Sequence, residues 1–379
     1  MSIDTDLYKQ AKEIVLSNNN YSISFLQRKL QISYNKATEL MQMIQKPEVE
    51  VETKFTKPTS KKITVIGIGG AAGNIISYMH TKEIKGVDLI SMNTDAEGLV
   101  YAKAHRRLQT GVVLTQGFGT DMCSAVGKEA ALESYEKIKA VLQGTGIVFL
   151  ITGLGGGTGS GATPIVAKIA KEMGIVVVSI VTKPFSFEGK RRIKIAEDEI
   201  KELKKYTNSL MIIPNDNLLS MIDRTLGLKE TFELVDNTIS EFIGNILEAL
   251  YSSSDTDINL SFEDLQSIFK YKGISAIGVS EKSGENAVEE AMGEAIEFPL
   301  FNNMDISDAM CVLIILKVHP DYSYIGIEKV IDNIDKNKDI SIIFTTSTDC
   351  SLPLDYIKAT VIATGFEKMI NSAVNNVYI

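Results

Sequence analysis

Two glycine-rich segments of the chain have the composition of anion-binding loops. The first, GIGGAAGN at 67–74, follows the apolar run ITVIG and precedes a helical pattern. The second, GLGGGTGSGATP at 153–164, follows GIVFLIT and places six glycines within nine residues. A strand, a glycine loop and a helix in this order present main-chain N–H groups to an anion at the helix N-terminus. Both segments are therefore candidates for phosphate binding.

Each glycine segment also has a purely structural interpretation. The first partly matches the dinucleotide fingerprint, with Gly67 and Gly69 in place and Ala72 at the third small position, but a tight turn needs the same residues. The second could be a flexible surface loop, although glycine loses so much backbone entropy that six of them are justified mainly beside a ligand. Its place between a buried strand and a helix favours the ligand, and the hydroxyls of Thr158 and Ser160 suit phosphate oxygens.

The segments that must position these loops alternate short β-branched runs with helical stretches. The runs that predict strands from Lys62 onward are ITVIG, VDLISMN, GIVFLIT, GIVVVSIV and SLMIIP. Helical patterns at 158–173 and 190–205 are long enough to be crossovers between parallel strands. This order predicts an α/β fold with a doubly wound, mostly parallel sheet.

A long amphipathic pattern follows the last of these strands. Apolar residues recur at three- and four-residue steps, which predicts one helix over 228–250 with a buried stripe. Beyond it, ISAIGVS, CVLIILKV, ISIIFTTS and ATVIATG alternate with helical patterns at 284–297 and 325–335. These runs predict a second, smaller α/β or α+β subdomain.

The composition is that of an ordinary globular protein and excludes several other classes. Of 379 residues, 44% are hydrophobic and 23% are charged, which excludes a largely disordered chain. The net charge of −9 argues against non-specific nucleic-acid binding along the whole surface. Three scattered cysteines fit neither a disulfide framework nor a zinc site. The apolar runs are shorter than a membrane span and no secretory signal opens the chain, so we expect a cytoplasmic protein.

The second glycine segment carries a family resemblance. GGGTGSG resembles the signature loop of the tubulin/FtsZ superfamily. Four further segments resemble motifs of bacterial FtsZ, in the same order and at similar spacing: NTDAEGL at 93–99, TKPFSFEGKRR at 182–192, IPNDNLL at 213–219 and TFELVDN at 231–237. The resemblance spans roughly residues 62–365 and implies a tubulin-like GTPase domain.

The resemblance implies a site for GTP or GDP, with Mg²⁺ as the accompanying ion. Glu188 would bind the ribose hydroxyls, and Arg192 would lie beside the sugar and phosphates. Phe232 would stack on guanine, while Asn215 and Asp236 would bind its polar edge. The residues that would hold the phosphates, largely through main-chain donors, are Gly70, Ala71, Ala72, Gly73, Asn74, Gly157, Thr158 and Gly159. As alternatives, Glu188 and Arg192 have the spacing of a surface helix pair, and Phe232 could be a core residue.

Two segments depart from the family pattern. In FtsZ-like proteins, an N-x-D-x-x-D loop after the long helix inserts two acids toward the nucleotide of the next subunit. Here Asn259 and Asp264 match and are the catalytic candidates, but Ser261 stands at the first acidic position. Loss of one acid predicts slow GTP hydrolysis, because such a group is typically worth about 100-fold or more. The second segment, GFGTDMCSAVG at 117–127, stands where FtsZ-like proteins have a pattern like G-x-G-A-G-A-N-P that wraps the γ-phosphate. Asp121 replaces one of its glycines, so either Mg²⁺ is held differently or sensing of the γ-phosphate is weakened.

The first residues form a separate pattern. YSISFLQRKLQISYNKATELMQMIQ at 21–45 predicts two short helices joined by a turn at 31–33. The small core expected for them is Ile23, Leu26, Leu30, Ile32, Ala37, Leu40 and Met41. From about Leu7 to Met43 the chain resembles the γ domain of the FtsK DNA translocase, a winged helix that binds DNA. Arg28, Lys29 and Lys36 would lie on the outer face, with Gln27 and Asn35 available for base edges or phosphates. KPEVEVETKF at 46–55 would be a shorter and more acidic wing. A three-helix packing module that binds no DNA is the alternative.

The expected organisation has six parts. They are a helix-turn-helix or winged-helix module over 1–46, a linker over 47–62, a GTP-binding domain over 63–228, a central helix over 229–250, a C-terminal FtsZ-like subdomain over 251–368 and a short tail over 369–379. Few residues follow VIATGFE, and they contain no recognisable peptide for docking on a membrane tether.

The expected function is that of a GTPase that polymerises head to tail into filaments, in bacterial cell division or DNA segregation, anchored to DNA by the first module. Its expected partners are further copies of itself, DNA and a second FtsZ. The main alternative is a hydrolytically impaired paralogue that regulates another FtsZ filament. An NAD-dependent oxidoreductase would explain only the first glycine segment.

Overall fold

In the computed structural model, the chain divides into two compact units, which we call the N-terminal module (Met1–Thr59) and the main unit (Ser60–Ile379). The structure describes residues 5–18, 22–45, 62–84, 86–218, 227–251, 257–301, 304–323 and 340–366. The helix expected at 325–335, the wing at 46–55 and the tail at 369–379 lie outside these ranges.

The N-terminal module contains three helices. They are α1 (Thr5–Ser17), α2 (Ile23–Leu30) and α3 (Tyr34–Gln45). A left-handed Gln31, with φ of 54°, ends α2 and turns the chain into α3, so the predicted helix-turn-helix pair is present. The core joins Leu26 of α2 and Leu40 of α3 to Ala11 and Val15 of α1. The predicted core began at Ile23 and did not include the residues that α1 contributes.

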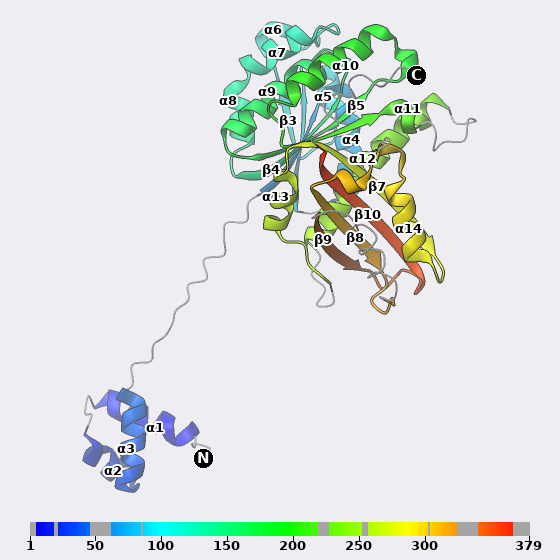
Figure 1. Cartoon of the computed structure of the whole chain (residues 1–379). Helices are drawn as coiled ribbons and strands as arrows, with labels where there is room; N and C mark the ends of the chain where they lie inside the picture. Colours follow the sequence, from blue (N-terminus) through cyan, green and yellow to red (C-terminus); the bar gives the residue numbers. More distant parts are fainter. Residues whose placement is uncertain are drawn as a thin grey trace. The chain divides into compact units, whose positions relative to one another are not determined.

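The main unit is built on one ten-stranded sheet, with the order β3-β2-β1-β4-β5-β6-β7-β10-β8-β9 (Figure 1). The strands are β1 (Lys62–Ile68), β2 (Val87–Asn93), β3 (Arg106–Gln109), β4 (Thr145–Gly153), β5 (Val176–Lys183), β6 (Ser209–Pro214), β7 (Gly273–Ser283), β8 (Cys311–Val318), β9 (Ser341–Thr348) and β10 (Tyr356–Phe366). Every predicted strand is present, and β3 is an additional edge strand.

The direction of the strands divides the sheet into two halves. Strands β1 to β6 are parallel to one another, as expected for a doubly wound domain. Strand β10 runs antiparallel to both β7 and β8, so the second half is an α+β subdomain. Only three residue pairs join β6 to β7, from Ser209 with Gly273 to Met211 with Ser275. This short ladder makes the two halves one continuous sheet.

Helices cover both faces of the parallel half (Figure 1). The helices of the main unit within the described residues are α4 (Gly70–Thr81), α5 (Ala96–Tyr101), α6 (Val112–Thr115), α7 (Ser124–Glu133), α8 (Tyr135–Val141), α9 (Thr158–Glu172), α10 (Lys190–Leu203), α11 (Asn215–Leu218), α12 (Leu228–Tyr251), α13 (Phe262–Lys270) and α14 (Ala287–Ile296), with 3-10 turns at Ser186–Glu188, Pro299–Phe301 and Ile306–Asp308. Ile147 and Phe149 of β4 face α4, α12 and α13, whereas Val148 and Leu150 face α9 and α10. Burial on both faces explains why these strands read as continuous apolar runs.

Helix α12 is the long helix that the apolar spacing predicted. Its 24 residues span about 36 Å, because an α-helix rises 1.5 Å per residue. Ile239, Phe242 and Ile246 form its buried stripe. The α+β half has its own core, in which α14 packs on β7 and β10. Among the helices that the structure describes, none is both long enough and apolar enough to cross a membrane.

Candidate functional site

A cavity of about 310 Å³ lies at the carboxyl ends of the parallel strands. It is lined by residues from the ends of β1, β4 and β5, from the first turns of α4 and α9, and from α11 and α12. The lining residues are Ile68, Gly69, Gly70, Ala71, Ile75, Thr120, Gly153, Leu154, Gly156, Gly157, Thr158, Gly159, Thr182, Pro184, Glu188, Arg192, Asn215, Phe232, Val235 and Asp236. Ligands of open α/β sheets bind at this edge of the sheet.

Two helix N-termini end at the cavity without a side-chain cap. Helix α4 begins at Gly70 after Gly69, whose φ is 86°, and α9 begins at Thr158 after Gly157. The first N–H groups of a helix have no acceptor within the helix, and the helix dipole makes them attractive to an anion. Gly70 and Gly156 leave this edge open, because a Cβ added to either would meet nothing within 4 Å. The arrangement suits a phosphate chain that bridges the two loops.

The glycines deeper in the second loop are required by packing. A Cβ on Gly157 would overlap the Thr120 hydroxyl and stand 2.7 Å from the Cys123 nitrogen. A Cβ on Gly159 would overlap the Thr152 hydroxyl and stand 2.8 Å from the Gly153 oxygen. The loop therefore packs directly on neighbouring main chain, and a larger residue would push it out of the cavity.

The hydroxyl groups of the second loop have different surroundings. Thr158 lines the cavity, and its Oγ1 lies 2.6 Å from Thr94 Oγ1 and 3.3 Å from Thr120 Oγ1. Ser160 is fully buried, and its Oγ accepts a 2.9 Å hydrogen bond from the Gly155 nitrogen. The expectation that Ser160 faces the phosphates is therefore wrong, since its hydroxyl holds the loop in shape.

The residues expected to bind a guanine base gather at one end of the cavity. Asn215 is 5% exposed, and its Oδ1 has no hydrogen-bond partner among the residues that the structure describes. Phe232 is 41% exposed and meets Phe185 edge to face, with ring centroids 5.3 Å apart. This exposure contradicts the alternative that Phe232 is a core residue. An aromatic face and an unsatisfied amide oxygen suit a planar base with polar edges.

Asp236 completes this group and has an unusual acidity. Burial, with a smaller contribution from the nearby Glu233 carboxylate, raises the pKa of Asp236 to about 7. Ionising a buried carboxyl group costs free energy when no hydrogen-bond donor is near it, and two N–H donors of a ligand would favour the ionised form. Because the folded pKa lies above the ordinary value of 3.8, Asp236 favours the folded state below pH 4, and this contribution is lost as the pH rises through 7.

Glu188 and Arg192 line the cavity and pair with each other. Arg192 Nη1 lies 2.7 Å from Glu188 Oε2, so the two side chains do pair, but not on one helix as the alternative proposed, because Glu188 ends a 3-10 turn and Arg192 lies in α10. Glu188 Oε1 also accepts a 2.9 Å hydrogen bond from the Phe185 nitrogen. The pair thus presents one fixed carboxylate and one cation, which is 41% exposed along its side chain, to the cavity.

Some predicted residues lie outside the lining, and some lining residues were not predicted. Ala72 and Gly73 are buried within α4, and Asn74 is exposed away from the cavity. Thr120, Thr182 and Pro184 are lining residues that were not among the candidates. Thr120 belongs to the segment at 117–127, so the resemblance of that segment to a γ-phosphate loop was the signal for it.

The cavity fits a guanosine nucleotide better than it fits a metal ion by itself. The unsatisfied Asn215 oxygen and the open glycines of both loops suit a base and a phosphate chain. Within the described ranges, no group of three or more His, Cys, Asp or Glu side chains could hold a metal ion. Mg²⁺ commonly binds through substrate phosphates and one or two carboxylates, so it would arrive with the nucleotide.

The catalytic candidates lie at the opposite end of the parallel strands from the cavity. Gln266 of α13 donates a 3.4 Å hydrogen bond to the Gly146 oxygen, at the amino end of β4, whereas Gly153 lines the cavity at the carboxyl end. Seven residues of strand separate these points, which is about 23 Å. Asn259 is exposed, and Asp264 lies in the first turn of α13. Asp264 and the cavity of the same chain therefore cannot meet.

Ser261 and Asp264 form a capping box at the start of α13. The Ser261 hydroxyl accepts a 3.0 Å hydrogen bond from the Asp264 nitrogen and donates to Asp264 Oδ2 at 2.5 Å. Asp264 Oδ2 also accepts from the Ser261 nitrogen at 3.0 Å. The serine at the expected acidic position therefore has a structural role in starting the helix.

The candidate DNA contacts of the N-terminal module lie at the end of α2 and the start of α3. Arg28, Lys29 and Asn35 are exposed, while Gln27 and Lys36 are half-buried. Arg28 Nε donates to the Ser24 oxygen at 3.1 Å, and Lys36 Nζ lies 3.2 Å from Glu39 Oε2. Arg28 Nε and Lys36 Nζ would have to give up these contacts within their own helices to bind phosphates or base edges.

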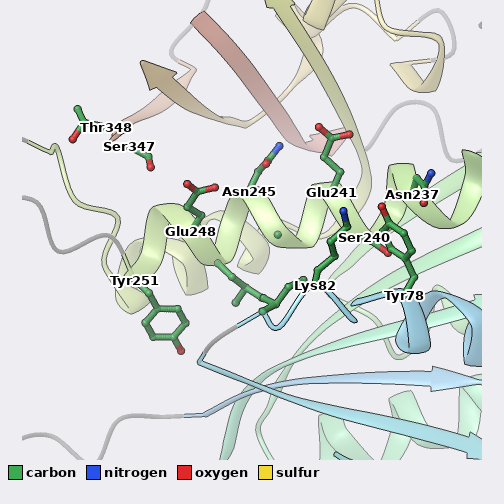
Figure 2. Close-up of a pocket in the computed structure, with 13 residues that line it drawn as sticks. Tyr78, Lys82, Asn237, Ser240, Glu241, Asn245, Glu248, Tyr251, Ser347 and Thr348 are labelled. Carbon is green, nitrogen blue, oxygen red and sulfur yellow. The ribbon is translucent and has the colours of Figure 1, made fainter. Parts of the chain in front are cut away.

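A larger cavity, of about 810 Å³, runs along α12 and contains none of the predicted residues (Figure 2). Its acids already have partners, because Glu241 pairs with Lys358 and Glu248 lies 2.6 Å from Lys317 Nζ. Tyr251 closes one end and donates a 2.8 Å hydrogen bond to the Gly86 oxygen. The larger size of this cavity therefore does not make it the better candidate for nucleotide chemistry.

Comparison with known proteins places both halves of the main unit in one family. Residues 62–223 match the GTPase domain of the Tubulin/FtsZ family, residues 273–367 match the C-terminal domain of the FtsZ family, and residues 3–52 match the Ftsk gamma domain. Cell division protein FtsZ of Coxiella burnetii is 36% identical over 312 residues, which are 82% of this chain and 80% of that protein. The same protein of Helicobacter pylori is 34% identical, over 82% of this chain and 81% of its own length. The solved FtsZ dimer of M. jannaschii has a TM-score of 0.75 at 31% identity, covering 89% of this chain and 94% of that one.

Proposed function

The chain belongs to the FtsZ proteins of the tubulin/FtsZ family, which are GTPases of cell division, and we propose that it binds GTP in the glycine-lined cavity and assembles head to tail with that nucleotide at each junction. The family assignment removes the NAD-dependent oxidoreductase alternative, which explained the first glycine segment alone. In this proposal, the residues of the cavity act as binding groups, and Asn259 and Asp264 act on the nucleotide of another copy.

The observation that carries the proposal is the position of Asp264 relative to the cavity. Asp264 follows the far end of α12, and its helix contacts the amino end of β4. The cavity lies at the carboxyl end of the same strand. An acid and a nucleotide site on opposite sides of one molecule can meet only between two copies. A contact between two different faces does not close on itself and extends into a filament.

Each part of the cavity has a proposed role in binding. The uncapped N-termini of α4 and α9 hold the phosphates, and Arg192 balances part of their charge. Phe232 stacks on the base. The Asp236 carboxylate accepts hydrogen bonds from two N–H groups of guanine, which adenine lacks on that edge. Mg²⁺ bound with the triphosphate would neutralise charge between the phosphate oxygens.

We further propose that hydrolysis is slow, because the incoming segment brings one carboxylate. Ser261 is committed to the cap of α13, and one oxygen of Asp264 is committed to the same box. The capping box equally favours the second candidate function, a hydrolytically impaired paralogue that joins and regulates another FtsZ filament. Turnover measured on the pure protein at assembling concentrations distinguishes the two, because the regulator would assemble without measurable turnover.

The N-terminal module is proposed to attach the filament to DNA. Residues 3–52 match the Ftsk gamma domain, and exposed Arg28 and Lys29 lie together at the end of α2. The positive side chains would contact phosphates, while Gln27 and Asn35 are suited to base edges. The main unit would then serve cell division or DNA segregation with its filament held on the chromosome or a plasmid.

Guanine selectivity and its pH dependence test the nucleotide site of the full chain. We expect GTP to bind at least about 100-fold more tightly than ATP, since a buried polar group that loses its partner penalises the wrong base. Because Asp236 must be ionised to accept from guanine and has a pKa of about 7, GTP should bind about tenfold more weakly at pH 6 than at pH 8.

Fluorescence titration with labelled GTP and ATP measures both quantities, and sedimentation with each nucleotide measures assembly. Asp236→Asn is the control for the pH effect, because it removes the titrating group and should make the remaining GTP affinity independent of pH in this range. Equal affinity for GTP and ATP, or no sedimentation with GTP, would discard the proposed function.

Loss of DNA binding on charge reversal tests the role of the N-terminal module. We expect the double variant Arg28→Glu/Lys29→Glu to bind duplex DNA at least about tenfold more weakly than the natural chain, with a shallower dependence on salt. Lys9→Glu, an exposed lysine on α1, is the matched control and should change little. Filter binding across a salt series measures these affinities. If the natural chain binds no DNA at low salt, the module is a packing domain.

A further inference from the structure

Three threonine hydroxyls form a row beside the second glycine loop. Thr158 Oγ1 lies 2.6 Å from Thr94 Oγ1 and 3.3 Å from Thr120 Oγ1. Thr94 follows β2, Thr120 lies between α6 and α7, and Thr158 is the first residue of α9. Thr94 is fully buried, whereas Thr158 and Thr120 line the cavity. The row therefore begins in the interior of the main unit and ends at the cavity.

The row holds one more hydroxyl proton than its own contacts use. Each hydroxyl supplies one proton and each contact uses one, so three hydroxyls joined by two contacts leave one proton over. Thr94 must be the donor to Thr158, because a buried hydroxyl proton without an acceptor is costly and Thr158 Oγ1 is its acceptor within the described residues. The remaining proton belongs to Thr158 or Thr120, and both residues present it to the cavity.

Packing holds the Thr120 hydroxyl against the start of α9. A Cβ on Gly157 would stand 2.2 Å from Thr120 Oγ1, so this oxygen lies directly beside the residue that precedes the helix. Gly157 brings no side chain that could cap α9. Thr120 is 8% exposed, so its hydroxyl can turn to the cavity but hardly to bulk water. A hydroxyl donor and uncapped helix N–H groups at one place suit the same anion.

This hydroxyl lies at the end of the cavity opposite the base-binding group. Asn215, which belongs to that group, directly follows β6, whereas Thr94 directly follows β2. The sheet order places β5, β4 and β1 between these two strands, which separates the two positions by four strand spacings, about 19 Å. A nucleotide whose base lies beside Asn215 therefore extends its last phosphate toward Thr158 and Thr120.

We propose that Thr120 is a specificity-determining residue of the nucleotide site, whose hydroxyl, beside that of Thr158, donates to the terminal phosphate of GTP and so favours GTP over GDP. The inference rests on the proposed function, since it assumes a guanine nucleotide in the cavity. The family pattern G-x-G-A-G-A-N-P has alanine where this chain has Thr120, so the pattern itself does not supply this donor. A diphosphate leaves the donor without an acceptor, and a hydrogen bond to a charged phosphate is stronger than one between neutral groups.

Comparison of GTP and GDP binding in the full chain tests the inference. Labelled nucleotides are titrated below the concentration at which the protein sediments, where no second copy brings Asp264 to the nucleotide. Thr120→Val removes the hydroxyl and keeps a branched side chain of similar shape. We expect it to bind GTP about tenfold or more weakly than the natural chain and GDP within about twofold. Thr120→Ala, which places the alanine of the family pattern here, should show the same difference without the extra methyl group of valine.

Two further variants separate a contact with phosphate from a structural role. Thr120→Ser keeps the hydroxyl and should bind GTP within about threefold of the natural chain. Thr238→Val is the matched control, because Thr238 is also 8% exposed and its hydroxyl donates to the Leu234 oxygen within α12, outside the cavity lining. It should leave the ratio of GTP to GDP affinity unchanged. Retained GDP binding shows that the site of each variant is folded.

Four results would overturn the inference. Thr120→Val and Thr120→Ala could bind GTP like the natural chain, they could lose GTP and GDP binding to the same extent, Thr120→Ser could fail to restore GTP binding, or Thr238→Val could change the ratio as much as Thr120→Val does. Failure of the natural chain to bind either guanine nucleotide is a different result, because it discards the proposed function and the inference together.

Discussion

Replacing Asp264 with asparagine is expected to lower GTP turnover by about 100-fold or more while leaving GTP affinity within about twofold of the natural chain. The large effect follows from the position of Ser261, which leaves Asp264 as the acid of the incoming segment. The small effect on affinity follows because α13 contacts the amino end of β4, away from the cavity of the same chain. Phosphate release at sedimenting concentrations and GTP titration below them measure the two quantities.

The neighbouring residue provides a matched control for Asp264→Asn. Glu263 is an exposed acid in the same first turn, so Glu263→Gln removes the same charge one position away and should retain turnover within about threefold. Asparagine keeps one acceptor oxygen for the Ser261 hydroxyl, and the helix start should survive the change. Turnover of Asp264→Asn equal to that of Glu263→Gln would show that the proposed catalytic role is wrong.

The long elements of the main unit were predictable because their hydrophobic periods are unambiguous. Helix α12 shows a stripe at three- and four-residue steps over 24 residues, and strands β4 and β5 are buried on both faces. Strand β3 gave no such signal, since its four residues include Arg106 and Arg107 and it lies at the edge of the sheet. The pairing of β6 with β7 depends on residues more than 60 positions apart, which no local pattern encodes.

Signals for some missed features were present in the sequence. Leu7, Ala11, Ile14 and Val15 have the spacing of a helix face, and α1 uses that face to complete the core of the N-terminal module. Ser261 and Asp264 have the spacing of a capping box before an apolar run, which the structure confirms. Position 261 was interpreted only as the place of a missing acid, and the capping box that Ser261 forms with Asp264 was not predicted.

The glycine loops indicated the chemistry of the cavity more clearly than its individual lining residues. Composition alone favoured an anion beside two helix N-termini, and the cavity lies there. The direction of each side chain depends on helix phase and tertiary packing. Gly70 therefore fronts the cavity while Asn74 of the same motif lies outside it, and Ser160 supports the loop from behind. The unsatisfied oxygen of Asn215 is visible only once the cavity is folded.

The second prediction with a large expected effect concerns the stability of the fold. At Gly161, helix propensity and steric overlap have opposite effects on the free energy of unfolding. Gly161 lies inside α9, where replacement of glycine by alanine favours an isolated helix by up to about 1 kcal/mol. A Cβ at this position, however, would overlap the Ser124 oxygen and stand 2.6 Å from the Lys128 nitrogen of α7. Both obstacles are main-chain atoms, so a side-chain rotation cannot relieve them and the two helices must move apart.

We therefore expect Gly161→Ala to lower the free energy of unfolding of the main unit by about 3 kcal/mol or more, since forced overpacking of main chain outweighs helix propensity. Gly293→Ala is the matched control, because Gly293 lies inside α14 and a Cβ there would meet nothing within 4 Å. That variant should be stabilised by about 0.5–1 kcal/mol. Urea unfolding followed by circular dichroism measures both changes. If the two substitutions change the free energy of unfolding with opposite signs, the close contact between the main chains of α7 and α9, beside the second glycine loop, requires glycine at 161. Changes of the same sign would contradict this conclusion.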